Sequence, residues 1–140
     1  MSKIAVVYWS GTGNTEAMAN AVADGAKGKG ADVDVLTASD FSADKVDGYD
    51  AIAFGCPAMG SEVLEEMEFQ PMFDDVKGKL SGKKIVLFGS YGWGSGEWMD
   101  NWKADCEAEG AQLAADPVIV NGAPDDDGLA QCKALGEAIA

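Results

Sequence analysis

Short apolar runs alternate along the chain with longer segments of helical period. Five runs read as strands that are apolar on both faces: residues 4–8, 33–36, 51–55, 85–89 and 113–120. Such runs are typical of a sheet covered on both sides. The pattern predicts helices over residues 14–27, 69–80, 97–109 and 128–140. Strands alternating with helices in five βα units predict an α/β fold, a doubly wound parallel sheet of five strands.

The loops after three of these strands are the unusual ones: residues 9–15, 56–66 and 90–96. In doubly wound sheets, ligands bind beyond the carboxyl ends of the strands, where the strand order reverses. If the order is 2-1-3-4-5, strands 1, 3 and 4 are neighbours. We therefore expect the three loops to form one composite site. With 140 residues and no repeat or linker, we expect one domain over residues 1–140.

The chain is strongly acidic, with a formal charge of −14, 10 cations that are all Lys, and no His. Such a surface repels nucleic acid and anionic membranes, and it attracts basic partners. Charge alone equally fits a protein kept soluble by its acidity. The absence of His excludes general base chemistry by imidazole and makes a zinc or copper site improbable.

The cysteines and the hydropathy of the chain indicate its cellular location. Cys56, Cys106 and Cys132 are scattered without a CxxC pair, as in a cytosolic protein with reduced core thiols. No apolar run approaches the ~20 residues of a membrane span. The first predicted strand begins almost at once, so we expect no signal peptide and a cytoplasmic location.

The loop between the first strand and first helix reads Ser10-Gly11-Thr12-Gly13-Asn14-Thr15. Its glycines allow a tight turn, its hydroxyl and amide side chains add donors, and the helix N-terminus adds partial positive charge. These features suit a terminal phosphate monoester. The loop is neither a P-loop nor a GxGxxG dinucleotide motif. The alternative is an ordinary capped turn, which the four polar side chains in six residues disfavour.

The two later loops carry candidate ring contacts. Trp93 stands among glycines, so an exposed indole could lie flat on a planar ligand, with Met59 on the opposite face. The alternative is a core tryptophan, for which a Gly-Trp-Gly loop is an awkward place. Trp98 and Trp102 lie four residues apart, so we expect them to pack the following helix, with Trp98 available to support the site.

These motifs together resemble the short-chain flavodoxins found in anaerobic bacteria. The matching segments are Tyr8–Thr15, Gly55–Glu62 and Leu87–Gly94, and the likeness covers nearly the whole chain. The strand order comes from this resemblance, since flavodoxin is itself a standard example of order 2-1-3-4-5 with flavin mononucleotide (FMN) at the switch point. The loop at residues 121–124 matches less well, so whether Gly122 contacts the flavin is left open.

The resemblance implies that FMN is held without a covalent bond. Residues 10–15 and Ser90 would hold its phosphate, Met59 and Trp93 would sandwich the ring, and Glu62 would accept from flavin N3–H. The full set of expected cofactor-binding residues is Ser10, Gly11, Thr12, Gly13, Asn14, Thr15, Pro57, Ala58, Met59, Gly60, Ser61, Glu62, Ser90, Tyr91, Gly92, Trp93 and Gly94.

The implied function is low-potential, one-electron transfer between semiquinone and hydroquinone, without enzymatic turnover. A peptide flip at Gly60, which glycine permits, would stabilise the neutral semiquinone. Negative charge throughout the chain would disfavour an anionic hydroquinone. Acidic clusters at Glu62/Glu65/Glu66/Glu68 and at residues 125–127 would dock basic redox partner proteins transiently, although residues 125–127 fit a helix N-terminus better. We expect a monomer.

Three other classes fit less well. A nicotinamide-dependent quinone or flavin reductase would need spare length and cations, and the chain has no Arg. A receiver domain would need acidic residues after the first strand, where Trp9-Ser10 stands. A structural domain without a ligand would leave the three aligned loops unexplained.

Overall fold

The computed structural model describes residues 2–11, 13–59, 63–92, 94 and 96–140. Its helices and strands follow in the order β1 (Lys3–Tyr8), α1 (Asn14–Gly28), β2 (Asp32–Thr37), β3 (Ala51–Gly55), α2 (Phe69–Val76), β4 (Lys84–Tyr91), α3 (Glu97–Ala108), β5 (Gln112–Leu113), β6 (Val118–Asn121) and α4 (Asp126–Ile139). The strands pair in parallel in the order β2-β1-β3-β4-β5, and β6 also pairs with β4. The predicted sheet and its strand order are confirmed.

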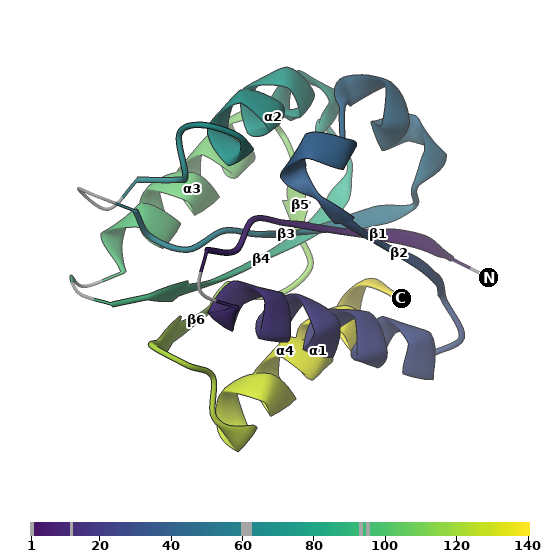
Figure 1. Cartoon of the computed structure of the whole chain (residues 1–140). Coiled ribbons are helices and arrows are strands. Elements are labelled where there is room, and N and C mark those ends of the chain that lie inside the picture. Colours follow the sequence, from purple (N-terminus) through teal and green to yellow (C-terminus); the bar gives the residue numbers. More distant parts are fainter. Residues whose placement is uncertain (1, 12, 60–62, 93, 95) are drawn as a thin grey trace.

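Helices cover both faces of this sheet (Figure 1), with α1 and α4 on one side and α2 and α3 on the other. Alternate residues of each strand face opposite sides. Val6 and Val86 pack into the cluster shared with α1 and α4, whereas Val7 and Leu87 pack into the cluster shared with α2 and α3. The apolar strands predicted from the sequence are therefore buried on both faces.

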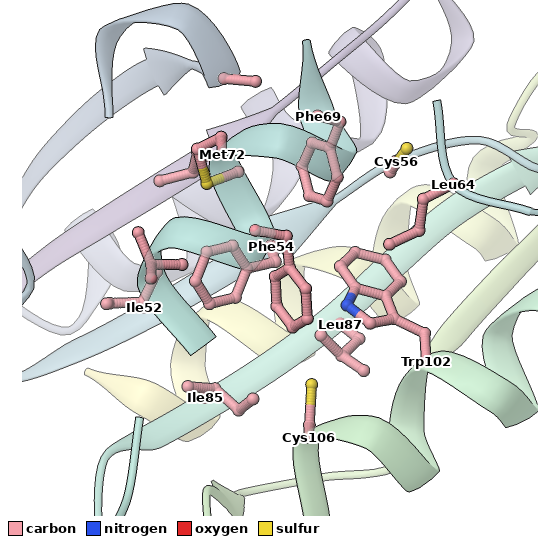
Figure 2. Packing of buried hydrophobic residues seen from close by; sticks show 14 of the residues in the cluster. Ile52, Phe54, Cys56, Leu64, Phe69, Met72, Ile85, Leu87, Trp102 and Cys106 are labelled. Atoms are coloured by element: carbon pink, nitrogen blue, oxygen red, sulfur yellow. The ribbon is translucent and has the colours of Figure 1, made fainter. Parts of the chain in front are cut away.

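Aromatic rings fill the layer between the sheet and helices α2 and α3 (Figure 2). Phe69 and Trp102 meet edge to face with ring centroids 5.4 Å apart, and Phe54 meets Phe73 in the same way at 5.6 Å. Such T-shaped pairs stabilise a core beyond the area they bury. Trp98 and Trp102 are both buried, as the helix-packing prediction required.

The connection from β2 to β3, where no helix was predicted, departs from the general βα alternation of the chain. It consists of two 3₁₀ segments, Ala38–Asp40 and Ala43–Gly48, in place of an α-helix. Hydroxyl and carboxylate side chains bond one another here, including Thr37 Oγ1, which donates to Asp40 Oδ2 at 3.1 Å. Such local bonds compete with helical hydrogen bonding.

The predicted fifth strand, residues 113–120, is divided into β5 and β6. The interruption at residues 114–117 includes Pro117, which has no N–H to donate to β4. The predicted helix over residues 69–80 likewise ends early, because the segment Lys77–Lys79 tightens to a 3₁₀ turn. No helix of the described residues has the length and hydropathy that crossing a membrane requires.

Candidate cofactor site

Strands β1 and β3 end at the same level of the sheet, and β4 continues three residues further, to Tyr91. Tyr8 is in register with Gly55, and Gly55 with Phe88. Pairing continues one residue further, where Trp9 N–H donates to Gly55 O at 3.0 Å and Cys56 N–H to Phe88 O at 3.1 Å. The three loops that the sequence singled out therefore leave the sheet at one edge.

A cavity of about 340 Å³ lies at this edge. Eight of the expected cofactor-binding residues line it: Gly11, Asn14, Pro57, Ala58, Met59, Ser90, Tyr91 and Gly92. Two further lining residues, Trp9 and Gly122, were not among those expected. None of these ten side chains carries a charge, so within the described part of the chain the cavity wall is neutral.

The first loop presents backbone donors at the start of α1. Gly13 adopts φ 93°, a left-handed conformation that favours glycine, and its N–H donates to Ser10 Oγ at 3.0 Å. Helix α1 begins at Asn14, and no N-cap side chain accepts from its first turn. The first-turn N–H groups have no acceptor within the helix, so they are suited to an anion.

Two buried hydroxyls join the first loop to the third. Thr15 Oγ1 and Ser90 Oγ lie 3.1 Å apart in hydrogen-bond contact. Thr15 is 1% exposed and Ser90 5% exposed. Each hydroxyl keeps further bonding capacity beyond this contact. Ser90 lines the cavity, and Thr15 supports it from behind at the N-terminus of α1.

The other expected residues lie elsewhere. Ser10 and Gly13 line a second, polar hollow of about 270 Å³. Thr15 lies behind the cavity wall against Ser90, and Gly94 is exposed with φ 90°. The expected residues Thr12, Gly60, Ser61, Glu62 and Trp93 lie outside the described residues.

The second loop is fixed on both sides of residues 60–62. Met59 and Val63 form an antiparallel bridge, in which each N–H donates to the other's carbonyl oxygen, at 2.8 and 3.0 Å. Ala58 N–H donates to Ser90 O at 3.0 Å and so ties this loop to β4. Met59 is thereby held at the cavity wall.

Trp98 supports the loop from below, as the sequence suggested it could. Its indole N–H donates to the carbonyl oxygen of Cys56 at 3.2 Å, and its ring lies 5.5 Å from that of Tyr91. A Cβ on Gly89 would fall 2.2 Å from the same Cys56 oxygen. Glycine at position 89 therefore allows the second loop to lie close against β4.

Glu65 was expected to belong to an exposed acidic cluster, but the structure buries it. It is 5% exposed, and its carboxylate accepts from the N–H groups of Met67, Glu68 and Phe69 at 2.9, 2.7 and 2.8 Å. Burial acts to raise the pKa of Glu65, but these backbone bonds outweigh it and hold the pKa below its usual value. Glu65 thus caps α2, while Glu66 and Glu68 remain exposed.

Cys56 packs beneath this loop (Figure 2). Glu65 N–H donates to Cys56 Sγ at 3.3 Å, and burial raises the pKa of the thiol to about 12. The thiol is therefore neutral at physiological pH and serves packing. Across the described ranges, no three His, Cys, Asp or Glu residues gather as a metal ion would require.

Sequence signals could have identified the two additional lining residues. Trp9 directly precedes the phosphate loop, and its indole N–H donates to Glu68 Oε2 at 2.8 Å. Gly122 follows the last strand with φ 73°, and its N–H donates to Tyr91 O at 2.8 Å. The weaker motif match at residues 121–124 had left open whether Gly122 lies at the site, and the structure places it on the cavity wall.

The residues present fit a phosphorylated, flat, largely apolar ligand. The cavity wall includes the Ser90 hydroxyl, Asn14 and the N-terminus of α1, and its described residues carry no cation, which suits a phosphate monoester. The remaining wall is formed by Trp9, Met59 and Tyr91 with backbone segments between them. Aromatic and methionine side chains of this kind suit the faces and edges of a planar ring.

Comparison with known proteins agrees with this geometry. The flavodoxin family model matches residues 6–136. The flavodoxin of Megasphaera elsdenii is 53% identical over 137 residues, covering 98% of each chain, and that of Clostridium beijerinckii is 44% identical over 135 residues, covering 96% of this chain and 97% of the other. The solution structure of two-electron reduced Megasphaera elsdenii flavodoxin superposes with a TM-score of 0.90 at 53% identity, covering 97% of each chain.

These similarities confirm the resemblance, the FMN cofactor and the role of electron carrier in place of enzyme. They also exclude the receiver-domain and reductase alternatives as the function of this chain. The chain therefore belongs to the flavodoxin family, whose members bind FMN and shuttle it between semiquinone and hydroquinone for redox partner proteins.

Proposed function

We propose that FMN binds in the cavity at the carboxyl ends of β1, β3 and β4, with its phosphate between residues 10–15 and Ser90. The observation that carries this assignment is the buried contact of the Thr15 and Ser90 hydroxyls beside the N-terminus of α1. Two buried hydroxyls next to a helix N-terminus, without a cation on the cavity wall, suit a phosphate held by neutral donors.

The ring would lie toward Met59, Tyr91 and Gly92. The bridge between Met59 and Val63 fixes the backbone beside residues 60–62, where ring-edge hydrogen bonds are expected from the sequence. When bound, FMN supplies the one-electron chemistry. The chain positions it, covers one face of its ring with Met59 and, in our proposal, the other with Trp93.

The charge distribution would make the second one-electron potential strongly negative. The described cavity wall has no cation, and the chain carries a net charge of −14. Added negative charge on a buried group is therefore poorly compensated. Each ~1.4 kcal/mol of this penalty lowers a one-electron potential by about 59 mV. Potentiometry should give a second potential well below that of free FMN, and the potential should rise with ionic strength.

Spectroscopic titration tests the assignment directly. The FMN-free chain is titrated with FMN and, in parallel, with riboflavin, which lacks the phosphate. We expect one FMN per chain and much weaker binding of riboflavin. Equal affinities for the two flavins would contradict the phosphate site. A protein that stays colourless with excess FMN would contradict the function itself.

For partners, we propose transient docking to basic redox proteins by a monomeric, cytoplasmic chain that forms one domain. Glu66 and Glu68 are exposed, and Glu68 lines the polar hollow beside the FMN cavity. The described residues form two ion pairs, so lysines neutralise few of the carboxylates within the chain. Electron transfer to a lysine-rich cytochrome should slow as ionic strength rises, because salt screens the attraction. A rate independent of salt would argue against electrostatic docking.

A further inference from the structure

Trp9 is the one described residue that lines both hollows beside the first loop. One is the 340 Å³ cavity assigned to FMN, and the other is the polar hollow of about 270 Å³, which Tyr8, Thr37 and Glu68 also line. The half-buried indole therefore forms a wall between them. If the indole turned toward the polar hollow, the FMN cavity would lose this wall.

Two contacts hold the indole in place. Its Nε1–H donates to Glu68 Oε2 at 2.8 Å. Its six-membered ring rests on Gly11, where a Cβ would fall 3.0 Å from Trp9 Cη2 and 3.2 Å from Cζ3. The indole thus contacts Gly11 of the first loop on one side and hydrogen-bonds to Glu68, just before α2, on the other.

Glu68 is itself on a fixed backbone. The Glu65 carboxylate accepts from the N–H groups of Glu68 and Phe69 at 2.7 and 2.8 Å. Glu65 N–H in turn donates to Cys56 Sγ, at the start of the same loop. The backbone that carries Glu68 is therefore held in place before Trp9 binds to it. Such preorganisation lowers the entropy cost of the Trp9–Glu68 hydrogen bond and so strengthens it.

We propose that Glu68 is a positioning residue that latches Trp9 as the wall of the FMN cavity. This inference rests on the proposed function, because it takes FMN to occupy that cavity. The latch and the charge of Glu68 predict opposite effects on FMN affinity when the carboxylate is removed. Removal of a carboxylate near an anionic ligand should tighten binding by charge alone. Loss of the latch should weaken it.

The test is the dissociation constant of the FMN-loaded protein, obtained by stepwise dilution with free FMN read from its fluorescence. Glu68→Ala should raise Kd about fivefold, the factor that corresponds to one net hydrogen bond. Glu66→Ala is the matched control, since it removes an exposed carboxylate from the same turn without removing a bond to Trp9. It should leave Kd unchanged or lower it.

Two further variants separate positioning from general damage. Glu68→Gln keeps an acceptor oxygen, so it should restore Kd close to the wild-type value. Trp9→Phe removes the donor, so adding Glu68→Ala in that background should no longer raise Kd, and through charge alone it should leave Kd unchanged or lower it. Thermal unfolding of each FMN-free variant reports whether the fold is intact.

The latch is refuted if Glu68→Ala binds FMN as tightly as Glu66→Ala, or if its effect persists in the Trp9→Phe background. If Glu68→Ala does not fold, Glu68→Gln decides with a conserved side-chain shape: the latch requires that it keep Kd close to the wild-type value. A wild-type chain that binds no FMN would instead refute the proposed function, so the two failures are distinguishable.

Discussion

Gly25 on α1 lies directly against the backbone of Lys133 on α4, where a Cβ on Gly25 would fall 1.9 Å from the Lys133 carbonyl oxygen. Gly136 on α4 faces Val22 on α1 in the same way, also at 1.9 Å. The two helices approach each other through these paired glycines, and neither backbone can yield as a flexible side chain would.

Gly25→Ala should therefore reduce the free energy of unfolding by about 1–3 kcal/mol, the usual penalty for forcing a methyl group into a packed contact. Gly28→Ala is the control on the same helix, because a Cβ there would meet nothing within 4 Å. It should be neutral or stabilise by up to ~1 kcal/mol through helix propensity. Urea denaturation of the FMN-free chain measures both. Equal effects would contradict the close helix contact.

Thr15→Val should weaken FMN binding by about 1–3 kcal/mol, because the Ser90 hydroxyl loses its buried partner and the phosphate loses a donor. The side chains are similar in size, so packing changes little. Riboflavin binding should respond much less. Thr37→Val removes an exposed hydroxyl outside the FMN cavity and should leave both affinities unchanged. Comparable losses for FMN and riboflavin would place Thr15 away from the phosphate.

Glu65→Gln should destabilise the fold at neutral pH, because an amide oxygen cannot replace all the acceptor bonds of the carboxylate. The folded pKa of Glu65 lies below its usual 4.5. Its charge-dependent stabilisation is therefore fully present above about pH 4.5 and is lost as pH falls through the folded pKa. The gap in unfolding free energy between wild type and variant should be constant from pH 8 to 5 and shrink below.

Glu66→Gln is the control for this titration, since Glu66 is exposed. Its stability should follow that of the wild type at every pH. If the difference in unfolding free energy between wild type and Glu65→Gln widened on acidification, the ionised carboxylate would not be the stabilising form.

The three thiols should be unreactive in the native protein. Cys56, Cys106 and Cys132 are fully buried, and burial raises the pKa of each thiol to about 12. Only the thiolate reacts readily with disulfide reagents. Colour development with such a reagent at pH 8 should be slow until denaturant is added and then reach three equivalents per chain. Rapid native labelling would show that at least one thiol is accessible.

The sequence predicted the sheet because its strands are apolar on both faces, a pattern that leaves few alternatives. It also placed Gly11, Asn14, Met59 and Ser90 near one another, since parallel strands bring their following loops to one edge. The first inference needs only periodicity, and the second also needs the strand order, which came from the resemblance to flavodoxins.

The features that the sequence did not reveal depend on contacts that exist only in the folded chain, some local and some between distant residues. Glu65 reads as one member of an acidic run, and only the folded turn shows its carboxylate directed at three backbone N–H groups. Trp9 lies beside the phosphate loop in sequence, but its acceptor Glu68 is 59 residues away. The division of the last strand at Pro117 was readable in principle, because proline interrupts pairing.

That division has a consequence for the behaviour of the protein at high concentration. An uninterrupted outer strand would present a long row of unpaired N–H and C=O groups, on which a second copy could build. Here the outer position beside β4 holds two short strands, β5 and β6, with Pro117 between them. This edge of the sheet is therefore a poor template for intermolecular β-pairing at high concentration.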